Sequence, residues 1–238
     1  MTRKLCNRSG VGALVLALAW LAGPAAWAQS FCSSDGQRPP AALLERFINA
    51  DCEACWAQAG PKPSPGELAL DWIVPASKGG EAPLSAAAIR DSTWRLEALQ
   101  RFAPDTVDAV RHAVQSALRG LRVSHGLPFK GYVGTSIALK SPPPGRWSSW
   151  LLLVETIPAG SDGTPIERNL VRNALQSSWG GAVPLSKEEL SRLYESRPMG
   201  IPEGATASRL RVVGWVEDGR GQMRAIAQSR CPAPGTDG

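Results

Sequence analysis

The sequence reads Ile48-Asn49-Ala50-Asp51-Cys52-Glu53-Ala54-Cys55-Trp56 at the end of an apolar run, which places a Cys-x-x-Cys motif where a turn of helix can begin. A cysteine at the start of a helix is favoured as a thiolate, because unpaired backbone amides and the helix dipole stabilise its negative charge. A second cysteine three residues later can close a disulfide with it. The motif therefore predicts a redox-active pair, with Cys52 as the nucleophile and Cys55 as the resolving cysteine.

Two other interpretations of the motif stay open, a permanent local bridge and a metal site. Closure of such a short loop contributes only about 2 kcal/mol in the chain-entropy model, against about 5 kcal/mol for a loop as long as that from Cys32 to Cys231. Zinc would need two further ligands, and the two histidines, His112 and His125, match no zinc-motif spacing. Both histidines are expected at the surface. The sequence predicts no metal and no cofactor.

The residues on either side of the first cysteine are acidic. Asp51 and Glu53 place two carboxylates beside Cys52 and disfavour its thiolate. The helix behind the motif is also expected to be short, because the Pro- and Gly-rich run from Gly60 to Gly66 cannot continue it. Both features predict a couple that is reducing, or inert if it is buried.

The first 28 residues have the layout of a cleaved signal peptide. Three basic residues precede an apolar core at 11–21 that is too short to span a bilayer comfortably, and Ala26-Trp27-Ala28 forms a small-x-small cleavage site. We therefore expect a periplasmic or secreted protein with no integral membrane segment in the mature chain. In an oxidising compartment, the four remaining cysteines indicate disulfides.

The charge of the mature chain is close to balanced. Residues 1–28 hold three basic and no acidic side chains, so 23 basic and 21 acidic residues remain after cleavage. No run of Lys and Arg follows, which makes nucleic acid a poor candidate partner. The sequence also lacks Gly-x-Ser-x-Gly, His-Glu-x-x-His and phosphate-binding glycine loops.

The pattern of apolar residues changes near residue 120. Before it, the pattern predicts strands at 43–48 and 68–74 and a helix at 85–102, while residues 105–119 fit both a helix and a strand. After it, a capping box at Ser186–Glu189 predicts one short helix, and Glu217–Gly221 predicts a hairpin turn. Strands are predicted at 121–124, 132–139, 150–156, 169–175, 210–216 and 223–229.

Seven tryptophans remain after residue 28. Trp147, Trp150, Trp179 and Trp215 lie in the strand-rich half, where aromatic side chains can fill a core or form exposed platforms for a sugar or peptide. We expect them in the core. Trp56 directly follows the Cys-x-x-Cys motif and is expected to cover its disulfide.

Several segments of the second half carry a resemblance to a known family. These are Trp150–Glu155, Glu167–Arg172 and the hairpin from Val212–Val216 to Ala225–Gln228. With the preceding order of strand, Cys-x-x-Cys, strand and helix, the chain resembles a family of secreted, thioredoxin-like proteins of unknown function from Gram-negative bacteria. The resemblance implies an envelope location and a thioredoxin-like half followed by a sandwich, and it implies no substrate.

The expected fold is therefore of the α+β class. A reduced thioredoxin-like α/β half over residues 29–120 precedes an antiparallel β-sandwich-like half over residues 121–238, and a Cys32–Cys231 disulfide ties the ends. The first expected function is thiol–disulfide exchange through Cys52 and Cys55. The alternative is a non-catalytic envelope module with structural disulfides, which binds an envelope protein or a glycan through the β half.

Overall fold

The computed structural model describes residues 32–179 and 192–231. The predicted signal peptide at 1–28 and the predicted helix start at 186–189 lie outside the described residues. None of the helices in the described ranges is long and apolar enough to cross a membrane.

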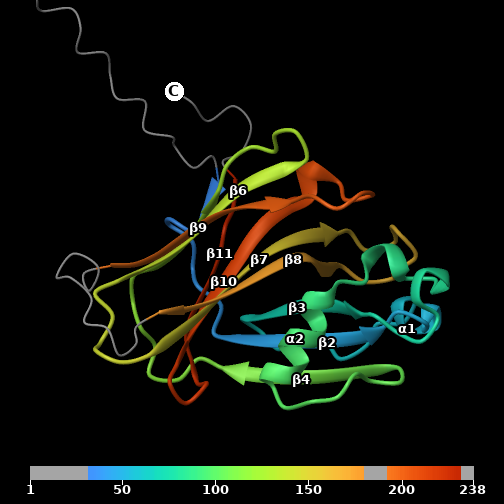
Figure 1. Cartoon of the computed structure of the whole chain (residues 1–238), viewed down its shortest axis with the longest axis horizontal. Helices are drawn as coiled ribbons and strands as arrows, with labels where there is room; N and C mark the ends of the chain where they lie inside the picture. The colour runs from blue at the N-terminus through green and yellow to red at the C-terminus, as the bar shows by residue number, and fades with distance from the viewer. Residues whose placement is uncertain (1–31, 180–191, 232–238) are drawn as a thin grey trace, which may run out of the picture.

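Two β-sheets make up most of the described chain (Figure 1). One has seven strands in the order β11-β10-β7-β8-β3-β2-β4, and the other has four in the order β1-β5-β6-β9. The strands are β1 (Cys32–Ser33), β2 (Ala42–Asn49), β3 (Glu67–Val74), β4 (Val107–Ala113), β5 (Leu121–His125), β6 (Tyr132–Lys140), β7 (Trp147–Ile157), β8 (Arg168–Trp179), β9 (Arg192–Gly200), β10 (Leu210–Asp218) and β11 (Met223–Gln228). The helices are α1 (Glu53–Trp56) and α2 (Arg90–Ala98), with 3-10 turns η1 (Gly79–Glu81), η2 (Ser85–Ala87) and η3 (Ala207–Arg209).

The seven-stranded sheet is mixed. β3 runs parallel to both β2 and β8, and the other pairs in this sheet are antiparallel. β2 and β3 are buried along almost their whole length, which is why they read as apolar runs rather than as alternating strands.

The segment that follows β4, one edge strand of the seven-stranded sheet, reaches β11, the other edge strand. Beyond the end of β4, the Gln115 amide donates to the Met223 carbonyl at 2.9 Å, and the Leu118 amide donates to the Arg224 carbonyl at 2.8 Å. The Arg224 side chain adds hydrogen bonds to the carbonyls of Gln115 and Ser116. These contacts pair backbone groups that an open edge would leave exposed.

Two large apolar clusters fill the two faces of this sheet. One packs on α2 and includes Leu96, Trp150 and Trp215, and the other lies against the four-stranded sheet and includes Trp147 and Trp179. All four of these tryptophans are buried, which confirms the core assignment. The two sheets approach closely at Gly214, where an added Cβ would lie 2.8 Å from Val123.

The expected α+β fold with a thioredoxin-like half is wrong. The described residues are mostly β, and their two α-helices have only four and nine residues. β2, β3 and β4 do not form a separate α/β unit, because β3 pairs with β8 and joins them to the strands of the second half. The division of the chain at residue 120 stays a prediction.

Two further predictions for residues 29–120 differ from the structure. The expected helix at 85–102 is reduced to η2 and α2. The ambiguous segment 105–119 forms β4, because pairing with β2 satisfies its backbone along seven residues. The strands predicted elsewhere are present within the described ranges, with bounds that differ by a few residues.

Candidate redox site and the arginine behind it

The Cys52–Cys55 disulfide lies in the turn that leaves the C-terminal end of β2 and enters α1. Asn49 shapes this turn, because its carbonyl accepts from the Cys52 amide at 3.0 Å and its side chain accepts from the Asp51 amide at 2.8 Å. Both cysteines are half-buried. The sequence-predicted pair is therefore brought together at the surface of the molecule, on a helix of only four residues.

The two acidic neighbours of Cys52, Asp51 and Glu53, have different surroundings. The Asp51 carboxylate accepts a hydrogen bond from the Ser77 hydroxyl at 2.8 Å and a longer one from the Lys78 amide. Glu53 is exposed in the first turn of α1. The Asp51 carboxylate is thus held against the loop at Ser77 and Lys78, while Glu53 faces solvent.

The C-terminal side of the disulfide turn is held by a buried arginine from β8. Arg168, which is 1% exposed, donates from Nη2 to the carbonyls of Trp56 at 2.9 Å and Gln58 at 2.6 Å. Its Nη1 donates to Asp71 at 2.8 Å, and its Nε donates to the Thr164 hydroxyl at 2.9 Å. One side chain thus connects the turn to β3 and to the loop before β8; these bonds are called the Arg168 anchor below.

A single carboxylate serves two buried guanidinium groups behind the turn. Asp71 accepts from Arg168 through Oδ1 and from Arg46 through Oδ2 at 2.7 Å, and all three residues are almost fully buried. Burial lowers the pKa of Arg168 and the Arg46 charge lowers it further, while Asp71 acts in the opposite direction. The cluster keeps an excess of positive charge.

Trp56, the last residue of α1, contacts the loop before β8 and the Arg168 side chain. Its indole nitrogen donates to the Asp162 carbonyl at 2.7 Å, and the Arg168 guanidinium lies 4.6 Å from the ring centre. Trp56 is buried in an apolar cluster against which Cys55 packs. Trp56 thus ties the end of α1 to the loop before β8, and its predicted cover over the disulfide stays a prediction.

The expectation of a surface position is wrong for His125, which is buried, whereas His112 is half-buried with 18% of its side chain exposed. His125 is 5% exposed and its ring approaches the Cys32–Cys231 disulfide, with one ligand atom from each of the three residues within 4.8 Å of the others. Burial lowers the pKa of His125. The strand pairing of β1 with β5 creates this contact, and neither histidine reaches the Cys52 turn.

His112 belongs instead to a second buried polar cluster. Its Nε2 lies 2.9 Å from Glu45, which also accepts from Arg95 at 2.8 Å. Burial would raise the pKa of Glu45, but the charge of Arg95 and the contact with His112 lower it to about 2. This cluster was not predicted from the sequence, where its signal is the single carboxylate of Glu45 within the apolar run Leu43–Ile48.

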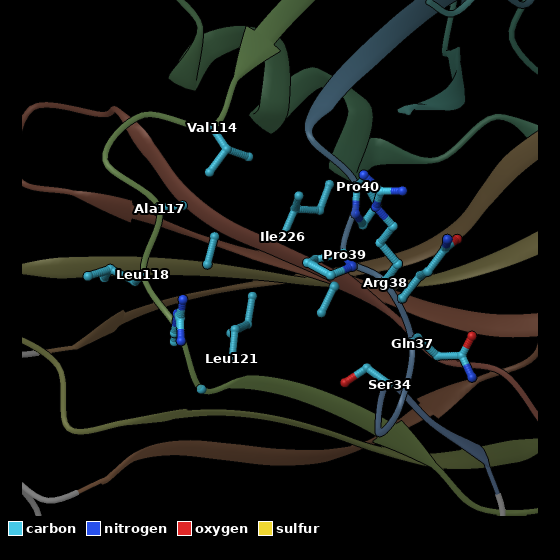
Figure 2. Close-up of a pocket in the computed structure, with 15 residues that line it drawn as sticks. Ser34, Gln37, Arg38, Pro39, Pro40, Val114, Ala117, Leu118, Leu121 and Ile226 are labelled. Carbon is cyan, nitrogen blue, oxygen red and sulfur yellow. The ribbon is translucent and has the colours of Figure 1, made fainter. Parts of the chain in front are cut away.

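Three pockets adjoin at one end of the seven-stranded sheet, and Gln228 lines all of them. The first, of about 260 Å³, is mainly apolar; Figure 2 shows the segment with Pro39 on one side of it and Leu118 and Leu121 on the other. A middle pocket of about 460 Å³ leads to a third of about 510 Å³ that is rich in arginine.

Comparisons with known proteins leave the function open. No family model matches this chain, and no curated protein matches it. An endonuclease/exonuclease/phosphatase from Beutenbergia cavernae DSM 12333 is similar over 55% of this chain and 32% of that chain, with 11% sequence identity and a TM-score of 0.27. The matched region spans about a third of that protein, and a similarity of this size assigns no activity.

Proposed function

We propose that this is an exported protein, periplasmic or secreted, that performs thiol–disulfide exchange through Cys52 and Cys55. The observation that carries the proposal is that the turn is held by contacts independent of its disulfide. Asn49, Trp56 and the Arg168 anchor fix it on both sides. A four-residue bridge adds only about 2 kcal/mol as a staple, so the stability of the fold is a weak reason for this pair.

The exchange would proceed in two steps. In the reduced protein, the Cys52 thiolate attacks one sulfur of a disulfide in a client protein, forms a mixed disulfide and releases one client thiolate. The Cys55 thiolate then attacks the Cys52 sulfur and releases the second client thiolate. Two electrons pass to the client, whose thiolates take up the two protons that the cysteines lose.

The surroundings favour the disulfide form of the pair. Strong oxidants owe their potential to a stabilised thiolate, whereas Cys52 here has Asp51 and Glu53 beside it and only a four-residue helix behind it. The Arg168 anchor also holds the turn in the geometry of the closed bridge. We therefore expect a reducing couple.

A glutathione redox titration with thiol trapping and peptide mapping tests this proposal. The wild type should exchange and equilibrate well below the value of about −120 mV that is typical of a strong oxidant. Asp51→Asn/Glu53→His should raise the potential, while Glu97→Gln on the exposed face of α2 should not change it. Cys55→Ser should accumulate a mixed disulfide at Cys52.

Two results would contradict the proposal in different ways. An equilibrium near −120 mV would show that the electrostatic argument is wrong although exchange occurs. No exchange, even in mild denaturant, would identify the Cys52–Cys55 bond as a structural bridge. The protein would then fit the alternative function, a non-catalytic envelope module that binds a protein or a glycan, which the adjoining pockets favour.

A further inference from the structure

The third pocket, called the basic pocket below, lies where β3 and β8 begin. It is lined by four cationic side chains and two acidic ones, together with apolar and amide groups. The charged residues are Arg46, Lys62, Arg211, Arg230, Glu67 and Glu167. Its volume of about 510 Å³ lies within the range of small-molecule sites.

The acidic residues of the basic pocket do not balance its cations. Glu67 already pairs with Arg111, which is not among the residues lining the pocket, and also accepts from the Ser64 amide at 2.8 Å. Glu167 is exposed, and no ion pair within 4.0 Å joins it to a described residue. Two cationic side chains of the pocket, Lys62 and Arg230, likewise lack such an ion pair among the described residues.

Arg211 gives the strongest indication that the basic pocket binds a ligand. Its Nη1 donates to Gln228 at 2.9 Å, but its Nε is buried without a hydrogen-bond partner among the described residues. Burial lowers the pKa of Arg211, and Arg230 lowers it further, while Glu167 raises it. Withdrawing a guanidinium from water costs free energy when no carboxylate pairs with it. A bound anion would supply the missing pair.

Arg46 adds a second guanidinium to the lining of the basic pocket. It is 2% exposed, and its Nε is also buried without a partner in the described chain. Its terminal nitrogens donate to Asp71 and to the Pro61 carbonyl. Because Asp71 is shared with Arg168, this wall of the pocket carries more positive than negative charge.

We propose that the basic pocket binds an oxyanion, the phosphate or carboxylate group of a small ligand, through Arg211 and Arg46. Guanidinium groups match such anions because their planar N–H donors point in the same direction as the oxygen lone pairs. The adjoining middle and apolar pockets would receive the rest of the ligand. This inference does not depend on the chemistry of Cys52 and Cys55.

Thermal unfolding of the full chain in different salts tests the proposal. Inorganic phosphate and citrate are added at low millimolar concentration, where the general stabilisation by excluded salts is small, and are compared with chloride at equal ionic strength. We expect at least one of the two oxyanions to raise the Tm by several degrees more than chloride, and the one that acts identifies the group. Arg211→Gln should abolish this difference, whereas Arg220→Gln, in the exposed hairpin turn between β10 and β11, should keep it.

The Tm without ligand separates a binding role from a structural one. If the function of Arg211 is to bind an anion, Arg211→Gln removes a half-buried charge that no carboxylate pairs within 4.0 Å among the described residues, and it should leave the Tm unchanged or raise it. A lower Tm with an intact phosphate or citrate response would overturn the proposal, as would a wild type that responds to neither oxyanion more than to chloride. If the variant fails to fold, the amide chemical shifts of the wild type are measured with and without the oxyanion. Binding should shift the amide signals of Arg211 and Gln228. Shifts confined to the Asp218–Gly221 turn would refute the proposed site.

Discussion

Replacement of Arg168 by glutamine removes the side chain that connects the disulfide turn to the sheet. The change deletes four short hydrogen bonds, to Asp71, Trp56, Gln58 and Thr164. Breaking a buried ion pair on one side costs about 3–5 kcal/mol. Asp71 keeps its bond to Arg46, so we expect the lower end, about 3 kcal/mol.

That loss corresponds to a fall in Tm of about 6–12 °C for a protein of this size. It can be measured by urea denaturation followed through tryptophan fluorescence and by calorimetry. Arg209→Gln is the matched control, because Arg209 makes a 2.9 Å ion pair with Asp162 but is 32% exposed. Such a surface pair contributes under about 1 kcal/mol. A loss as small for Arg168→Gln as for the control would refute the description of the anchor.

Arg168→Gln also tests whether the Arg168 anchor affects the Cys52–Cys55 couple. If Arg168 holds the turn in the geometry of the closed bridge, its loss should raise the Cys52–Cys55 reduction potential. Each 1.4 kcal/mol of lost preorganisation corresponds to about 30 mV for a two-electron couple. A potential identical to that of the wild type would show that the anchor supports the fold without affecting the disulfide.

Three other perturbations have defined outcomes. Because the pKa of Glu45 is lowered to about 2 in the folded protein, its ion pair should stabilise the protein fully above about pH 4.5 and lose its effect as the pH falls toward 2. Acid unfolding of the wild type and of Glu45→Gln measures this difference in stability. Serine at both Cys32 and Cys231 should cost about 5 kcal/mol in urea, against about 2 kcal/mol for the same change in the Cys-x-x-Cys turn, because the first bridge closes a separation of 199 residues. Gly214→Ala should lower the unfolding free energy by about 1–3 kcal/mol, because its Cβ would clash between the two sheets, whereas Gly134→Ala faces open space and should change it little; equal effects would contradict the close approach.

Much of the local structure could be predicted from the sequence. The apolar run at 43–48 and the one at 68–74 became β2 and β3, because each side chain alternates between two buried faces. Both disulfides followed from an even number of cysteines after the predicted signal peptide. The proline- and glycine-rich stretch after the motif limited α1 to a single turn, as expected.

The buried polar clusters could not be predicted. Arg95 is 50 residues from Glu45 in the sequence, and Arg168 is 97 residues from Asp71. Glu45 and Asp71 stand out only as single charges in apolar runs, and Arg95 and Arg168 have the local appearance of ordinary surface charges. Their roles depend on which strands lie side by side.

By itself, the sequence determined where strands can form, which cysteines could pair, and where the redox motif lies along the chain. The strand positions and the motif depend on residues within about ten positions of one another, where periodicity and turn chemistry act. The disulfides were inferred from the cysteine count of the whole chain. Only the tertiary structure decided that β3 pairs with β8, so that the two parts of the chain share one sheet, and that Arg168 therefore reaches the disulfide turn. Apolar strands of similar pattern can pair with many partners, and the choice among them depends on how completely all the faces are buried together, which no single segment encodes.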